Sequence, residues 1–402
     1  MLIVSLALLA LALHWFSRPQ RVADLILAQA GDALDLEITA AGASDYRLYG
    51  SAMLVIRDVV VREPKSKALV LRAERLLLEL PWSTIRSRGA DLTVKRVELD
   101  APVLDLAALQ KWQASRPPSG PARMPRLTDG LHIVRGEVIG DGWRVQAIDV
   151  DLPLLDPDRP VRAHLMGRIA SDSLQVPFNV HAGLTRPAAD AGLGVSGRLE
   201  PQSPPWSLPM HATLSGRLHN DDDGVGLDDL RLGADATYRN AGTDVPFTLG
   251  LAGPLRFHDG RLGFTNLGVA LWGAGVVPKL QGAGSLMFGD TLELRLQGAL
   301  QSWPRAWPAL PAPLSESTSP LPFLLDYRGR ADLSDTTQLM LSRDQTRFDG
   351  RLRLPAVLAW VDTFGRQSPL PPLEGHLSSP KLEIAGATLE GVEVEFHDGA
   401  LP

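Results

Sequence analysis

Apolar and charged side chains alternate one by one along much of this chain. Between Thr291 and Gln297, for example, three leucines are separated by Glu293 and Arg295. Successive side chains of a β-strand point to opposite faces, so a period of two predicts a strand with one apolar and one polar face. The clearest runs have their apolar positions at Leu76 and Leu78, at Leu174, Val176, Phe178 and Val180, at Leu292, Leu294 and Leu296, and at Val392, Val394 and Phe396. Because the pattern recurs so often, we expect a mostly β fold.

Turn dipeptides that contain glycine separate these runs. Glycine supplies the positive φ angles that tight hairpins need, and hairpins join antiparallel strands. The dipeptides are Asp129-Gly130, Asp141-Gly142, Asp259-Gly260, Gly289-Asp290, Asp349-Gly350 and Asp398-Gly399. With on the order of 20 strands about 4.8 Å apart, a single sheet would extend roughly 90 to 100 Å. The sequence therefore predicts an elongated, twisted antiparallel sheet, a trough or rod and not a ball.

The first residues predict a membrane-targeting segment. Residues 1–16 carry no charge and are mostly Leu and Ala, and Arg18 and Arg21 follow directly. The run is shorter than the roughly 20 residues of a full span, and 10–12 (Ala-Leu-Ala) resembles a cleavage site, so a retained anchor and a cleaved signal both stay open. An aromatic pair at the end of the run is typical of a membrane interface and favours the anchor. The anchor residues are Leu2, Ile3, Leu6, Leu9, Leu13, Trp15 and Phe16.

Helical spacing follows the anchor, and two proline-rich stretches later interrupt the strands. Residues 19–30 predict an amphipathic helix that ends at Gly31, and 355–365 predict a second short helix. Proline cannot donate to a sheet ladder, so 114–126 and the Trp- and Pro-rich 302–325 are expected to separate modules. The expected segments are an anchor (1–17), an N-terminal module (18–113), a linker (114–126), a run of strands (127–301), a crossing segment (302–325) and a C-terminal strand segment (326–402).

Composition excludes several classes of function. The net charge is −6 and the pI is near 5.9, so the chain lacks the basic surface that binds nucleic acid. No cysteine is present, which removes disulfides, thiolate catalysis and cysteine-based metal sites. The histidines show no paired metal-ligand spacing, and 221–224 (Asp-Asp-Asp-Gly) lacks the alternating ligands of a calcium loop. We therefore predict no catalytic residue, no metal, no cofactor and no nucleic-acid partner.

Several runs together resemble the AsmA family of cell-envelope proteins. The N-terminal membrane segment and short helix are followed by 73–80 (AERLLLEL), a helical turn at 81–85 and the run 94–106 (VKRVELDAPVLDL). In that last run a basic pair precedes a V-x-L-D-x-P-x-L-x-L pattern, which carries most of the likeness. Residues 369–375 and 389–394 are similar to strand-and-turn segments of these proteins. The motifs are patterns of hydrophobicity and turns, and they cover most of the chain.

The resemblance implies a repeating β-groove, with 18–113 as an AsmA- or chorein-like module, related to bridge-like lipid transfer proteins. It implies a bacterial inner-membrane protein with a single N-terminal anchor and its bulk in the periplasm. Its function would be to bind or conduct phospholipid along the groove in support of outer-membrane lipid homeostasis, together with other envelope proteins that complete the path. The alternating residues named above would be the groove residues, and no catalysis would be required.

Two other functions and one structural ambiguity stay open. A periplasmic scaffold that assembles outer-membrane or secreted proteins would use exposed strand edges. An envelope hydrolase on a β-sandwich is the third possibility. A leucine on an amphipathic strand packs either against a second sheet or against a ligand, and the sequence pattern is the same in both cases.

Overall fold

The computed structural model describes residues 36–41, 45–47, 50–64, 67–86, 92–115, 124–221, 224–240, 242–258, 260–307, 309–312, 314–330, 333–363, 372–384 and 387–397. The predicted membrane anchor, the predicted helix at 19–30 and the dipeptide Asp398-Gly399 lie outside these residues. Within the described ranges, no helix combines the length and apolar character needed to cross a membrane. The expectation of a mostly β fold is confirmed, because strands make up most of the described chain.

The chain divides into two compact units, which we describe separately. The first comprises residues 1–188 and 195–204, and the second comprises 189–194 and 205–402. The elements of the first unit are β1 (Glu37–Ala40), β2 (Asp45–Arg47), β3 (Ala52–Arg62), β4 (Leu69–Leu80), α3 (Trp82–Arg86), β5 (Thr93–Val94), β6 (Arg96–Asp100), β7 (Val103–Asp105), α4 (Leu106–Ala114), β8 (Arg126–Leu127), β9 (Leu131–Ile139), β10 (Trp143–Leu152), β11 (Val161–Ser171), β12 (Gln175–Leu184) and β14 (Gln202–Ser203). Strand β13 (Gly192–Leu199) contributes residues to both units.

Parallel strand pairs occur in the first unit, and they correct the prediction of a purely antiparallel sheet. Strand β9 runs parallel to both β6 and β7, and β5 runs parallel to β8. Parallel neighbours need a long crossover connection, which usually contains a helix. Helix α4 lies between β7 and β9 in the chain and forms part of that crossover. Alternation of apolar residues is the same in parallel and antiparallel strands, so the sequence pattern did not reveal this.

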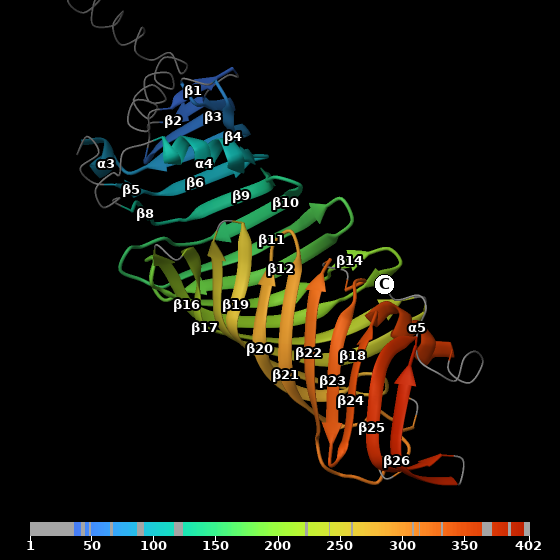
Figure 1. Ribbon diagram of the computed structural model, residues 1–402. Helices are drawn as coiled ribbons and strands as arrows, with labels where there is room; N and C mark the ends of the chain where they lie inside the picture. Colours follow the sequence, from blue (N-terminus) through green and yellow to red (C-terminus); the bar gives the residue numbers. More distant parts are fainter. Residues whose placement is uncertain are drawn as a thin grey trace, which may run out of the picture. The chain divides into compact units, whose positions relative to one another are not determined.

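Helix α4 covers one end of the first unit's sheet (Figure 1). The Asp105 side chain accepts a hydrogen bond from the backbone N–H of Ala108 at 2.9 Å, which caps the helix. Ala108 and Leu109 pack against a buried cluster that includes Ile56 and Val59. The helix therefore adds a second layer over this buried cluster, which comes from β3 and β4.

The second unit is an antiparallel meander in which each long strand pairs with the next (Figure 1). Its elements are β15 (Trp206–Ser207), β16 (Met210–Asp221), β17 (Gly224–Asn240), β18 (Thr243–His258), β19 (Arg261–Gly273), β20 (Lys279–Phe288), β21 (Leu292–Ser302), β22 (Leu321–Gly329), β23 (Thr337–Arg343), β24 (Thr346–Leu352), α5 (Leu354–Thr363), β25 (Leu373–Ile384) and β26 (Ala387–Phe396). Helix α5 confirms the short helix predicted over 355–365.

Irregular pairing recurs at one level of β16 to β19. The register shifts after Ser215, after Leu227, after Ala252 and after Phe264. Such bulges bend the strand and increase its right-handed twist. Bulges repeated on neighbouring strands therefore curve the sheet, and Figure 1 draws these strands as bent ribbons.

One predicted hairpin turn lies inside a strand. Asp349 and Gly350 belong to β24, where Gly350 pairs with Leu339 on one side and Gly375 on the other. A Cβ on Gly350 would lie 2.5 Å from the Phe348 ring, so glycine here makes room for an aromatic side chain. Gly130, Gly142 and Gly260 do adopt positive φ, as predicted for turns.

Glu79 is buried on the polar side of β4, and its pairing predicts a pH dependence. It is 8% exposed and accepts hydrogen bonds from the Ser51 hydroxyl and from Lys95 Nζ, the latter at 2.8 Å. The hydrogen bond with Lys95, more than that with Ser51, lowers the pKa of Glu79. A lowered pKa stabilises the fold above the unfolded value near 4.3, and that contribution is lost as pH falls through the folded pKa.

We therefore expect Glu79→Gln to lower the free energy of unfolding by about 1–3 kcal/mol at pH 7. The difference from wild type should shrink steadily as pH falls below about 4, because protonated Glu79 resembles glutamine. Urea unfolding of both proteins at a series of pH values measures this. A difference that stays constant down to the lowest pH would contradict the ion-pair explanation.

Candidate functional site

One face of the second unit's sheet is apolar across all of its long strands. The register pairs place one residue from each strand side by side in a continuous row. This row consists of Leu214, Leu232, Leu251, Val269, Gly282, Gly298, Phe323, Leu341, Phe348, Leu377 and Val394. Every member is apolar or glycine. We call the side of the sheet that carries this row, from β16 to β26, the apolar face of the second unit.

The structure places the predicted groove residues of the second unit on this face. Leu296 and Phe396 lie in one row, joined through Leu325, Leu339, Gly350 and Gly375. On β21, Leu292 and Leu294 lie four and two positions before Leu296, so their side chains point to the same face. The same holds on β26 for Val392 and Val394 relative to Phe396. Leu296 and Phe396, which are 100 positions apart in the sequence, are thus on one surface.

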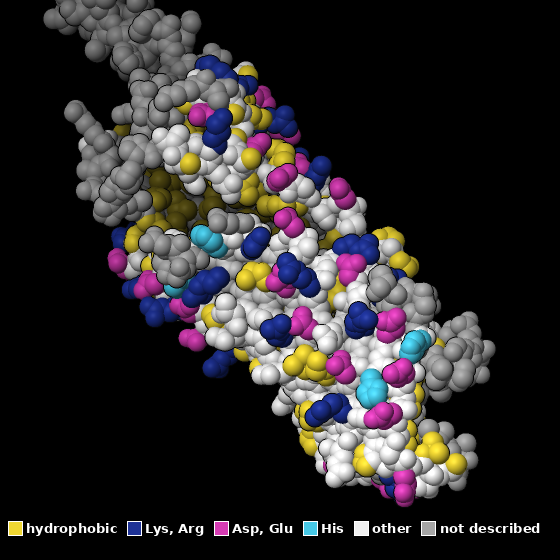
Figure 2. Space-filling view, in the orientation of Figure 1, with side chains coloured by type: hydrophobic (Ala, Val, Ile, Leu, Met, Phe, Trp, Pro, Cys, Tyr) yellow, Lys and Arg dark blue, Asp and Glu magenta, His cyan; other side chains and the backbone are white. Residues whose placement is uncertain are grey.

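The opposite face carries charges that pair across neighbouring strands. Arg295 on β21 contacts Asp326 on β22 at 2.7 Å, and Arg328 on β22 contacts Glu293 on β21 at 3.3 Å. Most of these side chains are exposed, so this face is suited to water. Figure 2 shows dark blue and magenta side chains mixed over the surface that faces the viewer.

Side chains on the apolar face differ in burial, and the predicted groove residues are not its most buried members. The six predicted side chains Leu292, Leu294, Leu296, Val392, Val394 and Phe396 are all half-buried. Among the described residues of this unit, the elements that contact each other extensively are strands that are neighbours in the sheet. Leu294 and Leu296 of β21 pack against the buried cluster that contains Phe264 and Leu267 of β19.

The apolar face becomes most exposed beside three hairpin tips. Val225, Phe257 and Phe288 lie in one register row with Leu292. Their exposed fractions are 54%, 52% and 43%. Large apolar side chains that stay exposed together mark surfaces that bind apolar partners more often than inert surfaces.

The other end of the apolar face meets the connection between β21 and β22, of which residues 303–307, 309–312 and 314–320 are described. Trp307 Nε1 donates to the Val276 carbonyl at 3.0 Å, and the Glu383 N–H donates to the Ala312 carbonyl at 2.8 Å. Leu321, at the start of β22, is only 5% exposed. The predicted crossing segment (302–325) contains this connection.

The first unit has an apolar face of its own. Leu76 and Val180, both predicted groove residues, lie in one row with Ile56, Leu99, Ile133, Val150 and Leu165. Leu78 lies in the neighbouring row, and Val176 and Phe178 share the parity of Val180 on β12.

Leu174 departs from the prediction. It precedes β12, its carbonyl accepts the Ser171 N–H at 2.9 Å in a turn, and its side chain is 37% exposed. The sequence alternation continues one step beyond the strand, because the turn residue happens to be apolar.

We compared the chain with protein-family models, curated proteins and solved structures. No match was found. The resemblance to the AsmA family therefore stays a pattern of sequence motifs, and what this protein does has to be argued from its own side chains.

Glycines on the apolar face are a feature that the sequence analysis missed. The Phe348 ring lies over Gly350 and Gly375, where added Cβ atoms would come within 2.5 and 3.3 Å of it. Phe348 and Phe396 form an edge-to-face pair with centroids 6.2 Å apart. In the sequence, Gly350 and Gly375 occupy apolar positions of alternating strands. A glycine at such a position marks the close approach of a neighbouring group and could have predicted this feature.

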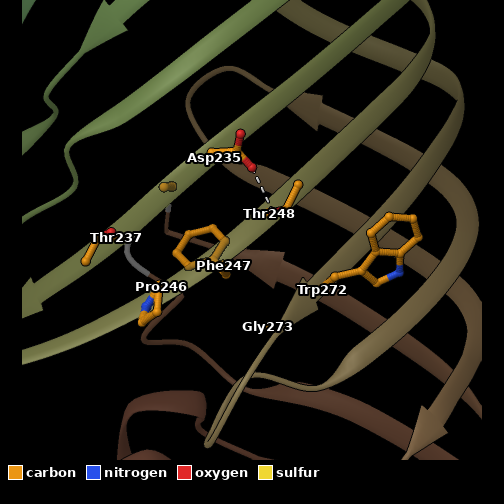
Figure 3. Close-up of a pocket in the computed structure, with 8 residues that line it drawn as sticks. Asp235, Thr237, Pro246, Phe247, Thr248, Trp272 and Gly273 are labelled. Carbon is orange, nitrogen blue, oxygen red and sulfur yellow. Dashed lines mark hydrogen bonds between the residues drawn. The ribbon is translucent and has the colours of Figure 1, made fainter.

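A shallow pocket of about 350 Å³ lies at β17, β18 and β19 (Figure 3). Thr248 donates a hydrogen bond to Asp235 at 2.8 Å, and Trp272 beside them is 51% exposed. Asp235 is the one titratable side chain in the lining. The pocket therefore lacks the second acid or base that most hydrolytic mechanisms use. Among the described residues, no group of His, Asp or Glu side chains is arranged to hold a metal ion.

Proposed function

We propose that this protein binds phospholipid through its acyl chains, which lie on the apolar faces of its sheets. The observation that carries the proposal is the unbroken apolar row from β16 to β26 whose side chains stay half-buried. Such a surface is costly to leave in water, because apolar area removed from water is worth about 25 cal/mol per Å². The paired charges on the other face identify which side water solvates.

Acyl chains fit this surface better than a rigid ligand does. Each buried methylene contributes about 0.8 kcal/mol, so a chain of a dozen or more carbons is held by area alone. The row of paired residues offers no fixed polar group along its length, so a chain can also slide. In the cell, the AsmA resemblance supports an inner-membrane-anchored, periplasmic protein that supplies lipid for the outer membrane without catalysis.

A second candidate is a scaffold for the assembly of other envelope proteins. In the described part of the chain, β26 pairs with β25 alone, so one edge of this strand offers free backbone N–H and C=O groups. An extended polypeptide can add to such an edge as a further strand.

Native mass spectrometry of the full chain extracted in mild detergent separates the two candidates. We expect mass additions that match intact phospholipids, confirmed by lipid extraction and fragmentation. The control is a detergent-matched soluble β-protein without an apolar face, which should carry none. Retention of peptide without lipid would overturn the proposal in favour of the scaffold.

A further inference from the structure

Arg343 is a cation on the apolar face of the second unit. It ends β23 at the same parity as Leu339 and Leu341, and it is only 6% exposed. Burying a charged side chain is expensive unless an opposite charge and hydrogen bonds compensate it. The position therefore calls for a partner.

Protein groups satisfy only some of the N–H donors of Arg343. Arg343 Nη1 donates to the carbonyls of Leu314 and Ser317, at 3.0 and 3.4 Å, in the β21–β22 connection. Its Nε is buried and has no hydrogen-bond partner. In the described chain no carboxylate forms an ion pair with Arg343, and Glu383 on β25 pairs instead with Lys381 at 3.2 Å. In the described chain the guanidinium is thus not paired with a carboxylate, and its Nε–H donor is unused.

Hydroxyl groups adjoin Arg343 on the same face. Thr346 is its direct register partner on β24, and the Thr346 and Ser379 hydroxyls are 2.8 Å apart and buried. Ser379 donates its hydrogen to the Lys381 carbonyl at 2.9 Å, so Thr346 is the hydroxyl that can rotate and donate to an incoming oxygen atom. Next to this polar group, Leu341 and Phe348 begin the apolar row that crosses the sheet. A cation with a neighbouring hydroxyl, that of Thr346, therefore lies where the apolar row ends.

We propose that Arg343, assisted by Thr346, binds the phosphate of a phospholipid whose acyl chains lie on the adjoining apolar face. The planar guanidinium matches phosphate oxygens through two N–H groups at once, and charge-assisted hydrogen bonds of this kind are the strong ones. The carbonyls of Leu314 and Ser317 hold the side chain in place, and the remaining donors meet the headgroup. The inference rests on the proposed lipid function and adds to it a preference for phosphorylated headgroups.

A competition between two lipids with identical acyl chains tests this. The full-length protein in detergent is offered equal amounts of dioleoylphosphatidylglycerol and dioleoylglycerol, which lacks the phosphate, and the bound lipids are counted by native mass spectrometry. We expect wild type to retain the phospholipid about tenfold over the diacylglycerol, equivalent to ~1.4 kcal/mol. Arg343→Gln should bring the ratio to within about twofold without lowering the total lipid bound, because the acyl surface is unchanged.

Two variants serve as controls. Arg347→Gln removes an equal charge from the exposed, opposite face of β24 and should keep the tenfold preference. Arg343→Lys keeps the positive charge but loses the planar fork, and should give an intermediate ratio. If circular dichroism shows that Arg343→Gln does not fold, the headgroup site is judged from the lipid ratio of wild type and from that of the Arg343→Lys variant.

The outcomes separate the headgroup site from the lipid function itself. Equal retention of both lipids by wild type would overturn the headgroup site and leave acyl binding standing, whereas retention of neither would overturn the proposed function. Arg343→Gln could instead keep the tenfold ratio and only make residues 303–320 easier to cleave by protease. Arg343 would then only fix the β21–β22 connection to the sheet, and the headgroup site would be wrong.

Discussion

Replacing Leu294 with glutamate is expected to lower the phospholipid retained by the purified protein at least about tenfold, equivalent to ~1.4 kcal/mol or more. Leu294 lies on the apolar face between Leu286 and Tyr327. A carboxylate at this position must lose water or take up a proton before an acyl chain can cover it, and both are costly. The strand itself should persist, because β21 is paired along its length on both sides. Native mass spectrometry measures the lipid, and circular dichroism measures the sheet.

The matched control is Gln297→Glu, which adds the same charge to the other face of the same strand. Gln297 is exposed and pairs with Ala283 and Leu324. We expect its lipid retention to stay within about twofold of wild type, since a solvated carboxylate costs little. Adding Leu292→Glu to Leu294→Glu should remove the remaining binding. Undiminished retention in the double variant would mean that lipid lies elsewhere or is not bound.

Replacing Gly284 with alanine is expected to cost about 3 kcal/mol or more of unfolding free energy. A Cβ at this position would lie 1.8 Å from the Arg295 carbonyl oxygen on the paired strand, where no flexible side chain can move aside. The β20–β21 pairing must therefore open locally. For a unit of this size, the midpoint of thermal unfolding should fall by roughly 6–12 °C, measured by circular dichroism or calorimetry.

Gly233→Ala is the control for this second prediction. On the solvent-facing side of β17, an added Cβ would meet only Thr213 Oγ1 at 3.6 Å, an ordinary contact. We expect a change within about 1 kcal/mol, stabilising if anything, because alanine restricts the unfolded chain. A comparable loss of stability in both variants would show that glycine is needed for a general reason and not for close strand approach.

Local alternation was enough to assign side chains to faces. Leu292, Leu294 and Leu296 share a face with each other and oppose Glu293 and Arg295, as their spacing predicted. The prediction went one residue too far at Leu174, because a turn residue can be apolar by chance. It also treated Asp349-Gly350 as a hairpin signal, although this glycine serves a neighbouring phenylalanine within a strand.

The sequence analysis also missed Arg343, a charged residue at an apolar position of a strand. Arg343 continues the parity of Leu339 and Leu341, yet its sequence neighbours give no sign that it is buried. Its guanidinium instead contacts the carbonyls of Leu314 and Ser317, which belong to an earlier part of the chain. No rule of strand periodicity contains that contact.

The sequence by itself determined the class of structure and the two-faced character of each strand, because these depend on the backbone geometry of a few successive residues. Tertiary structure alone decided which strands became neighbours, that β6 and β9 run parallel, and that Leu296 and Phe396 share a row. It also decided that Leu292, Leu294 and Leu296 stay half-buried on that face. Those properties arise from pairing between distant segments, whose register is fixed by the summed hydrogen bonds and apolar contacts of whole strands.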